Sequence, residues 1–418
     1  MVSDQADERM LLKRIVEHFL GSSQFNGFFI NFESSFLAES AALLVQNGLV
    51  EVVSEDDFSN IFILPWRINR PVREKIEAIH HAAEGHSHGV CLYPTPNALK
   101  GFLKPEQFQD EPFKRRLAEG HGCLEYAYFK FEVLREYRDD PKFRFSFDDF
   151  GVSFHITNSA FIDPNETDTE KTGLRRAGFA YGFAEGKDGP IIRRIVVSLR
   201  DLTQLSSLHQ QRWQTYEVPH QEGLRPHPVW LAHQMGEWVS SIGPFERFMF
   251  ELRAWNELHR NAFGGDLLQT TERPREFGWI LGPTQHEYDD FIHMLDKLLS
   301  ENLKPQAFKN LGISGKDEDG KSRGTLARLD LLLKSKQVSE MQREIVLKPF
   351  RHVRNERAMP AHHIRQNATN PDFILQQANL LHEITTSLEW LREFWHMHPA
   401  NKDWQAPDHV QNGGGYKF

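Results

Sequence analysis

The chain has 418 residues, of which 39% are hydrophobic and 26% charged, and its formal net charge is −9. These values are typical of a soluble globular protein of two or three domains. The negative charge argues against a protein that coats nucleic acid along its whole surface. Its only cysteines, Cys91 and Cys123, are too few for a disulfide framework and suit a reducing compartment. Because no long apolar run and no signal-peptide core occur, we expect a cytoplasmic protein without a membrane segment.

The first 70 residues carry two helical patterns followed by two short β-rich runs. Apolar residues at helical spacing predict helices over 6–20 and 36–46, and an Asn-Gly pair ends the second. Runs of β-branched and aromatic residues at 49–53 and 61–64 flank a turn-forming sequence. This pattern predicts the two strands of a β-hairpin.

Two helices and a short hairpin resemble a winged-helix module, which would occupy residues 1–70. Winged helices bind DNA, but many serve as protein contacts. The predicted wing is acidic, since it carries Glu51, Glu55, Asp56 and Asp57. These carboxylates would repel phosphate, so the sequence favours a protein partner for this module and leaves DNA binding as the alternative.

A middle α+β domain is expected over residues 71–272. It opens with a helix over 71–85 and a polar loop. Residues with zinc-binding spacings lie there, namely His80, His81, Glu84, His86 and His88. Nearby glycines and the lack of a second ligand cluster favour a flexible loop instead.

A second set of candidate ligands is Asp139, Asp140, Asp148 and Asp149. Asp-Asp-Pro is a common turn, and basic residues interrupt the set, so the sequence predicts no metal site.

The clearest strands of the chain lie in this domain. Runs at 177–183 and 191–199 flank a glycine-rich loop at 185–189 and predict a hairpin. Runs at 143–145 and 152–156 extend it into a small antiparallel sheet. Helices that could cover the sheet are expected over 112–119, 124–137, 203–217, 228–240 and 243–260. Neither a phosphate-binding glycine loop nor a Gly-x-Ser-x-Gly nucleophile turn occurs in this domain.

A helical bundle is expected over residues 273–400, after a polar boundary near 270–274. Thr284 and Glu287 form a capping-box-like start for its first helix. A charged, glycine-rich loop at 312–324 follows that helix. Three further amphipathic helices are expected over 326–334, 339–359 and 371–395, and residues 401–418 form a polar tail. The predicted fold class is therefore α+β, mostly helical.

Basic and histidine side chains gather in the segment 348–363 of the bundle. Arg351, Arg354 and Arg357 are spaced by three residues, so a helix stacks them along one face. A proline between Arg357 and His362 is expected to bend or end that helix. An arginine that holds a phosphate beside a histidine that titrates near neutrality suits phosphodiester chemistry.

Arg357 and His362 fit an Arg-x4-His motif, and a long amphipathic helix follows them. Together with the four-helix layout of residues 284–399, the motif resembles the HEPN superfamily. These small helical bundles are common in prokaryotic toxins and phage-defence proteins. Members usually carry Asn, Asp or His directly after the arginine, whereas this chain has Ala358. The resemblance implies an endoribonuclease of this toxin or defence type that needs neither metal nor cofactor.

The resemblance also implies a role for each residue. His362 would act as general base or acid while a ribose 2′-hydroxyl attacks the adjacent phosphate, and Arg357 would stabilise the charge that builds there. The residues that would hold the RNA are Arg351, Arg354, Asn355 and His363. HEPN enzymes generally pair two motifs across a homodimer, so a symmetric dimer through the bundle is expected.

The charge of segment 343–365 is consistent with an RNA-binding spot, because it holds six Lys or Arg residues against two acids. Two alternatives remain. The bundle could be a non-catalytic dimeric scaffold whose arginines form interfacial ion pairs, which Ala358 favours. The chain could also be a DNA-binding regulator that uses its amino-terminal module.

Overall fold

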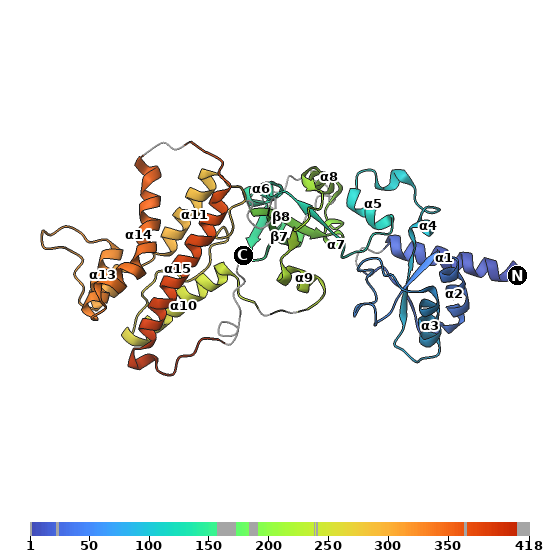
Figure 1. The fold of residues 1–418 in the computed structure, drawn as a ribbon, viewed down its shortest axis with the longest axis horizontal. Coiled ribbons are helices and arrows are strands. Elements are labelled where there is room, and N and C mark those ends of the chain that lie inside the picture. Colours follow the sequence, from blue (N-terminus) through green and yellow to red (C-terminus); the bar gives the residue numbers. More distant parts are fainter. Residues whose placement is uncertain are drawn as a thin grey trace. The chain divides into compact units, whose positions relative to one another are not determined.

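In the computed structural model the chain is an α+β protein, about half of it helical (Figure 1). The structure describes residues 2–21, 25–156, 173–183, 191–237, 239, 241–362 and 366–407. The chain divides into two compact units. Unit 1 comprises Met1–Phe145, Val152–Ala180 and Arg193–Pro226, and unit 2 comprises Ser146–Gly151, Tyr181–Ile192 and His227–Phe418. The polar stretch at 270–274 therefore lies inside unit 2.

The amino-terminal part of unit 1 is a three-stranded sheet covered by helices. Its strand order is β1-β3-β2, and β3 (Val90–Pro94) runs antiparallel to both β1 (Phe28–Ile30) and β2 (Val50–Val53). The helices packed with it are α1 (Val2–Gly21), η1 (Phe32–Leu37), α2 (Ala38–Gln46) and α3 (Val72–Ala83). Apolar residues from all three strands and from α1, α2 and α3 form one buried core, so this substructure continues past residue 70.

The predicted wing hairpin is wrong. Val50–Val53 is a strand as expected, but its partner is β3, and residues 61–64 form turns. Isolated hydrogen bonds hold the backbone of this turn. The Tyr93 hydroxyl donates to the Ile61 carbonyl at 2.6 Å, and the Gly27 amide donates to the Phe62 carbonyl. Ile61 and Ile63 are buried, which explains their hydrophobicity without a strand.

The second sheet has the strand order β5-β6-β7-β8-β4-β9, and β10 pairs with β7. The four predicted strands are present in adjacent positions as β5 (Phe143–Phe147), β6 (Gly151–Ile156), β7 (Gly173–Phe183) and β8 (Ile191–Ser198). The strands that the sequence did not predict are β4 (Tyr126–Phe129), β9 (Glu217–Val218) and β10 (Arg225–Pro226). β4 runs antiparallel to β8 and β9. The predicted loop at 185–189 lies outside the described residues.

The expected helix over 124–137 is mostly wrong. Strand β4 occupies its first half, followed by η3 (Phe131–Leu134) and α6 (Arg135–Asp139). Three consecutive residues of β4 are buried, so its aromatic side chains follow neither a helical stripe nor a simple alternation. The other helices of this part of unit 1 are α4 (Pro96–Leu99), η2 (Pro105–Phe108), α5 (Pro112–Ala118), α7 (Leu199–Leu202) and α8 (Ser207–Tyr216).

A hydrogen-bonded trio lies in the aromatic core of unit 1. The Tyr137 hydroxyl accepts a hydrogen bond from Trp213 Nε1 at 2.9 Å and lies 2.6 Å from His209 Nδ1. Which of these two groups donates is set by the tautomer of the His209 ring. Tyr137 is fully buried and stacks on Phe154 with ring centroids 3.8 Å apart. Burial raises the pKa of the Tyr137 phenol, which therefore stays neutral.

Unit 2 is a helical bundle. Its helices are α9 (Pro228–Gln234), α10 (Pro244–Phe263), α11 (Gln285–Leu298), α12 (Pro305–Asn310), α13 (Thr325–Ser335), α14 (Glu340–His362), α15 (Asp372–His396) and η6 (Pro399–Asn401). α15 packs on α10, α11 and α14, and α14 also packs on α11 and α13. The four predicted bundle helices are thus confirmed, and α10, predicted as a helix of the middle domain, packs with them as a fifth. None of the helices in the described residues is long and apolar enough to cross a membrane.

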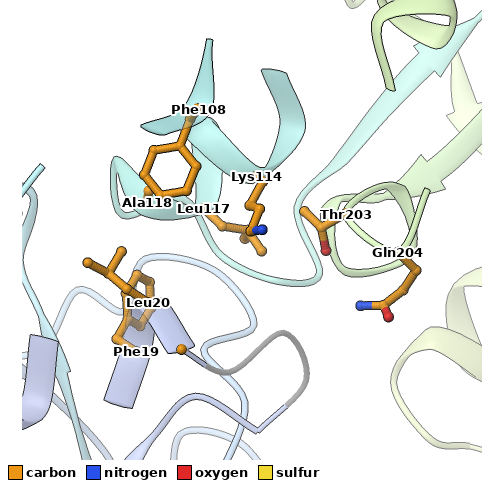
Figure 2. A pocket seen from close by; sticks show the side chains of 9 residues that line it. Phe19, Leu20, Phe108, Lys114, Leu117, Ala118, Thr203 and Gln204 are labelled. Atoms are coloured by element: carbon orange, nitrogen blue, oxygen red, sulfur yellow. The ribbon is translucent and has the colours of Figure 1, made fainter. Parts of the chain in front are cut away.

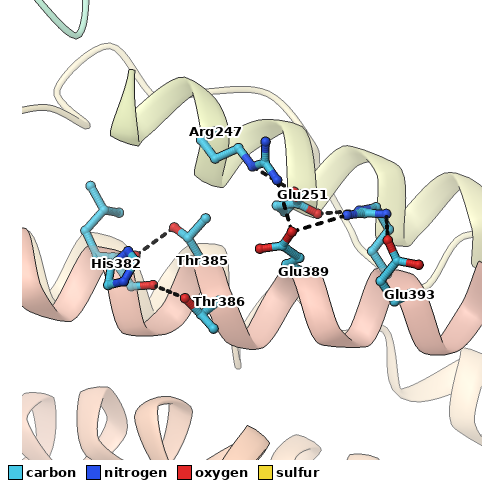
Figure 3. Close-up of polar contacts among 9 residues, drawn as sticks. Arg247, Glu251, His382, Thr385, Thr386, Glu389 and Glu393 are labelled. Atoms are coloured by element: carbon cyan, nitrogen blue, oxygen red, sulfur yellow. Dashed lines mark hydrogen bonds and ion pairs between the residues drawn. The ribbon is translucent and has the colours of Figure 1, made fainter. Parts of the chain in front are cut away.

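Charged side chains join α10 to α15 inside this bundle (Figure 3). Glu251 of α10 is fully buried, accepts a hydrogen bond from Arg392 Nε at 2.6 Å and lies 2.9 Å from Arg247 Nε. The Arg392 and Arg247 guanidinium groups extend the network to Glu389 and Glu393 of α15. Burial raises the pKa of Glu251, while the hydrogen bond from Arg392 and the positive charge of Arg392 act to lower it.

We expect Tyr137→Phe to lower the free energy of unfolding by about 1–3 kcal/mol, because Trp213 Nε1 and His209 then lose a buried partner without a large change in volume. Urea unfolding followed by circular dichroism would measure the loss. Tyr216→Phe, at a half-buried position, is the matched control and should change stability by less than about 0.5 kcal/mol. Equal losses for both variants would contradict the role assigned to the trio.

Candidate functional site

The predicted site residues other than His363 lie on α14, whose buried side faces the rest of the bundle. Val346, Phe350 and Val353 are buried at spacings of four and three residues, as expected of an amphipathic helix. Arg357 lies four residues after Val353, where this apolar stripe would continue. The sequence thus places a charge where the helix faces its neighbours, and that charge needs a partner.

The partner of Arg357 is Asp296, a residue of α11 that the sequence did not single out. The Asp296 carboxylate is fully buried, and Arg357 Nη1 donates to its Oδ2 at 2.7 Å. The same Nη1 also donates to Glu301, just after α11. The hydrogen bond that Arg357 donates to Asp296 is the main cause that raises the pKa of Arg357.

Arg354 contacts the same end of α11. Its Nη1 donates to the Ser300 hydroxyl at 2.8 Å and lies 3.7 Å from Asp296 Oδ2. Ser300 in turn donates to the other oxygen of Asp296. Two guanidinium groups and one hydroxyl therefore surround a single buried carboxylate. This arrangement satisfies Asp296 and fixes α14 against α11.

Two of the other predicted residues, Arg351 and Asn355, do not converge on this point. Arg351 pairs with Glu344 of its own helix at 2.6 Å, and Asn355 is exposed. His362 is the last residue of α14, and its side chain lies outside the described part of the structure, as does the whole of His363. The structure thus brings Arg354 and Arg357 together and leaves the position of the histidine side chains untested.

The helix does not end at Met359, as the following proline led us to expect. α14 continues through Pro360 to His362. Pro360 has no N–H to donate to the Glu356 carbonyl, so the helix continues with one hydrogen bond fewer. Arg357 and position 362 therefore belong to one continuous helix.

Only one of the two hydrogen bonds of the predicted capping box is present at the start of α11. Thr284 accepts a hydrogen bond from the Glu287 amide at 3.4 Å, which makes it the N-cap. The Glu287 carboxylate does not bond back to Thr284 and accepts instead from the Leu281 and Gly282 amides, at 2.6 and 3.2 Å. α11 is thus anchored at its first turn to the preceding loop, which helps to place Asp296 at its far end.

Three of the aspartates considered as metal ligands have other partners. Asp140 and Asp148 accept hydrogen bonds from backbone amides two residues later, as expected of turns. Asp149 is buried in unit 2, where it pairs with Arg273 at 2.9 Å and accepts from the Glu246 amide at 2.8 Å. Within the described part of the chain, no group of three or more His, Cys, Asp or Glu residues is placed to hold a metal ion.

Unit 1 contains an open pocket of about 360 Å³ between α1 and α5 (Figure 2). Its apolar side is formed by Phe19, Leu20, Phe108 and Leu117, and its polar side by Lys114, Thr203 and Gln204. The Lys114 ammonium group already pairs with Glu111 at 3.2 Å, and Thr203 donates to the Arg200 carbonyl. These polar groups are engaged, so the carboxy-terminal part of α14 remains the stronger candidate site.

Comparisons of the chain with protein-family models, with curated proteins and with solved structures found no match. The resemblance of residues 284–399 to HEPN bundles, and of residues 1–70 to winged helices, therefore rests on the sequence alone.

We expect Asp296→Ala to lower the free energy of unfolding by about 1–3 kcal/mol, because Arg357, Arg354 and Ser300 lose their shared acceptor while the guanidinium groups can still turn to water. Urea unfolding monitored by tryptophan fluorescence would measure this. Asp290→Ala on the same helix is the control, since the Asp290 side chain is 68% exposed and should contribute less than about 0.5 kcal/mol. If both variants unfolded at the same urea concentration, Asp296 would not hold the helices together.

Proposed function

We propose that unit 2 is a HEPN-like, metal-independent endoribonuclease whose site lies at the carboxy-terminal end of α14. The observation that carries the proposal is the way in which the Arg357 guanidinium group is held. Its guanidinium group is oriented by a buried carboxylate through one nitrogen, Nη1. Within the described residues, Nε and Nη2 make no hydrogen bond, and the side chain is 29% exposed. A guanidinium held in this way is preorganised to donate its remaining N–H groups to a phosphate.

The proposed reaction is attack of a ribose 2′-hydroxyl on the adjacent phosphate. A base takes the 2′-hydroxyl proton, the oxygen forms a bond to phosphorus, and the 5′-oxygen leaves with a proton from an acid. The products are a 2′,3′-cyclic phosphate and a 5′-hydroxyl. His362 supplies the base or the acid, because an imidazole titrates near neutral pH. Arg357 stabilises the negative charge that builds on the phosphate oxygens.

The spacing of the two residues favours a site that uses two copies of the chain. At about 100° per residue, positions 357 and 362 differ by roughly 140° around the axis of α14. Position 357 faces α11, whereas position 362 falls on the side that carries Glu344, Lys348 and Asn355, all of them exposed. A second protomer placed against this exposed side would bring two copies of position 362 near each other.

An exposed apolar strip on α14 supports such a dimer. Met341 and Ile345 are 75% and 61% exposed, and they lie one turn apart on the side of α14 away from the core. Surfaces that a partner covers commonly expose large apolar side chains next to each other. We therefore propose a symmetric homodimer through this strip, with RNA bound near the ends of the two α14 helices.

Incubation of the purified protein with total RNA in the presence of EDTA should yield discrete fragments that end in 2′,3′-cyclic phosphates. His362→Ala and Arg357→Ala should each lower the cleavage rate by at least about a hundredfold, since one removes proton transfer and the other removes charge stabilisation. Electrophoresis and end-group mapping of the RNA would measure this.

His382→Ala is the matched control, because it removes an exposed histidine of α15 that lies in neither the proposed site nor the proposed dimer strip. This variant should cleave at the wild-type rate. Cleavage that survives in His362→Ala, or that depends on a divalent metal, would contradict the proposed chemistry.

Light scattering at micromolar protein concentration should show a dimer, and Ile345→Glu should convert it into a monomer, because a charge would be buried in the proposed interface. Met397→Glu changes a comparably exposed residue just after α15, at 73% exposure, and should leave the dimer intact. A wild-type protein that is monomeric under these conditions would exclude the two-chain site.

A second candidate function is a non-catalytic scaffold, and the ion pairs of α14 favour it. Arg343 pairs with Asp330 at 2.9 Å, Arg351 with Glu344, and Arg357 with Asp296 and Glu301. Carboxylates of α11 and α13 thus reduce the basic excess of the segment. The two functions differ in their response to Arg357→Ala and His362→Ala, which would leave the assembly of a scaffold intact. The exposed acids Glu55 and Asp56 do not favour the alternative of a DNA-binding regulator.

A further inference from the structure

A group of exposed phenylalanine side chains lies on unit 1. We call it the phenylalanine face and define it as Phe29, Phe32 and Phe62, which are 36%, 65% and 40% exposed. The rings of Phe29 and Phe62 contact each other with centroids 5.2 Å apart. Phe25 and Phe36, at 55% and 77% exposure, lie close by in sequence on the same two segments. Single exposed apolar residues are common, but such a concentration of aromatic rings indicates an interaction surface.

The loop between α3 and β3 supports this face. Gly85 has φ +78°, and a side chain there would begin 3.7 Å from the Phe32 ring. Gly89 has φ +141°, and its Cβ would lie 2.4 Å from the Phe29 ring, which is closer than atoms can approach. Glycine at 89 therefore lets the Phe29 ring lie over the loop backbone. The rings are held at the surface by the fold rather than left to turn inward.

An acidic pocket of about 300 Å³ adjoins the phenylalanine face through Gly89, which lines the pocket and also contacts Phe29. The pocket is lined by the carboxylates of Glu55, Asp56, Glu74 and Glu77, with Arg70 and His81 beside them. Arg70 pairs with Asp57 at 3.2 Å and lies 3.9 Å from both Asp56 and Glu74. Glu55 is exposed and forms no ion pair with a described residue. The carboxylates outnumber the single arginine, so the pocket is negative.

We propose that the phenylalanine face and this pocket together dock a basic, amphipathic segment of another protein. The aromatic rings would cover the apolar side chains of the segment, and its Lys or Arg residues would enter the acidic pocket. Charge complementarity selects this partner: a nucleic acid would be repelled by the carboxylates, and an acidic peptide would be repelled as well. Aromatic anchors beside a charged rim are the usual composition of a protein-binding surface.

The test uses the full-length protein and two fluorescein-labelled amphipathic helical peptides, one of leucine and lysine and one of leucine and glutamate. Fluorescence anisotropy should show that the lysine peptide binds and that its Kd rises with salt, while the glutamate peptide does not bind. Phe32→Ser and Glu55→Lys should each weaken binding by about tenfold or more, as expected for an anchor and for a reversed charge.

Two variants on other parts of unit 1 serve as matched controls. Leu208→Ser changes an apolar side chain that is 59% exposed, and Glu222→Lys changes an exposed acid. Both should bind the lysine peptide as the wild type does, and circular dichroism would establish that all four variants are folded.

Three results would overturn the proposal. The first is equal binding of both peptides, which would remove the role of charge. The second is equal weakening by the controls, which would place binding elsewhere. The third is a change of oligomeric state in Phe32→Ser, which would show that a second copy of the chain covers the face.

Discussion

The helices of unit 2 are joined by carboxylates that are buried among apolar side chains and matched by guanidinium groups. Asp149 pairs with Arg273 and caps the start of α10, Glu251 pairs with Arg392 between α10 and α15, and Asp296 pairs with Arg357 between α11 and α14. Burying one such charge without its partner would cost several kcal/mol. Each pair therefore fixes one alignment of two elements, whereas apolar contacts alone would tolerate sliding.

The pair formed by Asp296 and Arg357 joins this structural role to the proposed chemistry. A guanidinium that binds phosphate must be correctly oriented before the substrate arrives, and Asp296 orients that of Arg357. The same carboxylate also offsets the positive charge that would attract RNA to the proposed site. Because Arg357 uses one nitrogen for both carboxylates, its structural role and its proposed catalytic role are compatible in geometry, although they compete in charge.

Much of the fold followed from local patterns in the sequence. The four strands from Phe143 to Ser198 and the four main bundle helices were predictable, because each has a sustained period or a clear turn. The strand Tyr126–Phe129 was missed since three of its residues in a row are buried, which leaves no alternation to detect. The run at 61–64 was misread because a buried turn and a short strand have the same composition. Pairing of β2 with β3 depends on contacts between distant residues, and no local pattern reports these.

The candidate site was predictable as a set of residue types but not as a set of partners. The sequence shows that Arg357 continues the stripe of Val346, Phe350 and Val353, and this position alone implies a buried counter-charge. The apolar stripe of α11 contains Ile292 and Leu295, and Leu299 continues it. Asp296 lies next to Leu295 and four residues after Ile292, so it is a charged residue on the buried side of that helix. Two opposite charges at stripe positions of two helices predict that the helices touch there. Arg351 lies off the stripe and pairs within its own helix, so its charge can be lost without leaving a buried carboxylate unpaired. The same reasoning ranks the arginines: Arg357 is fixed by the fold, and Arg351 is the one most free to serve a ligand.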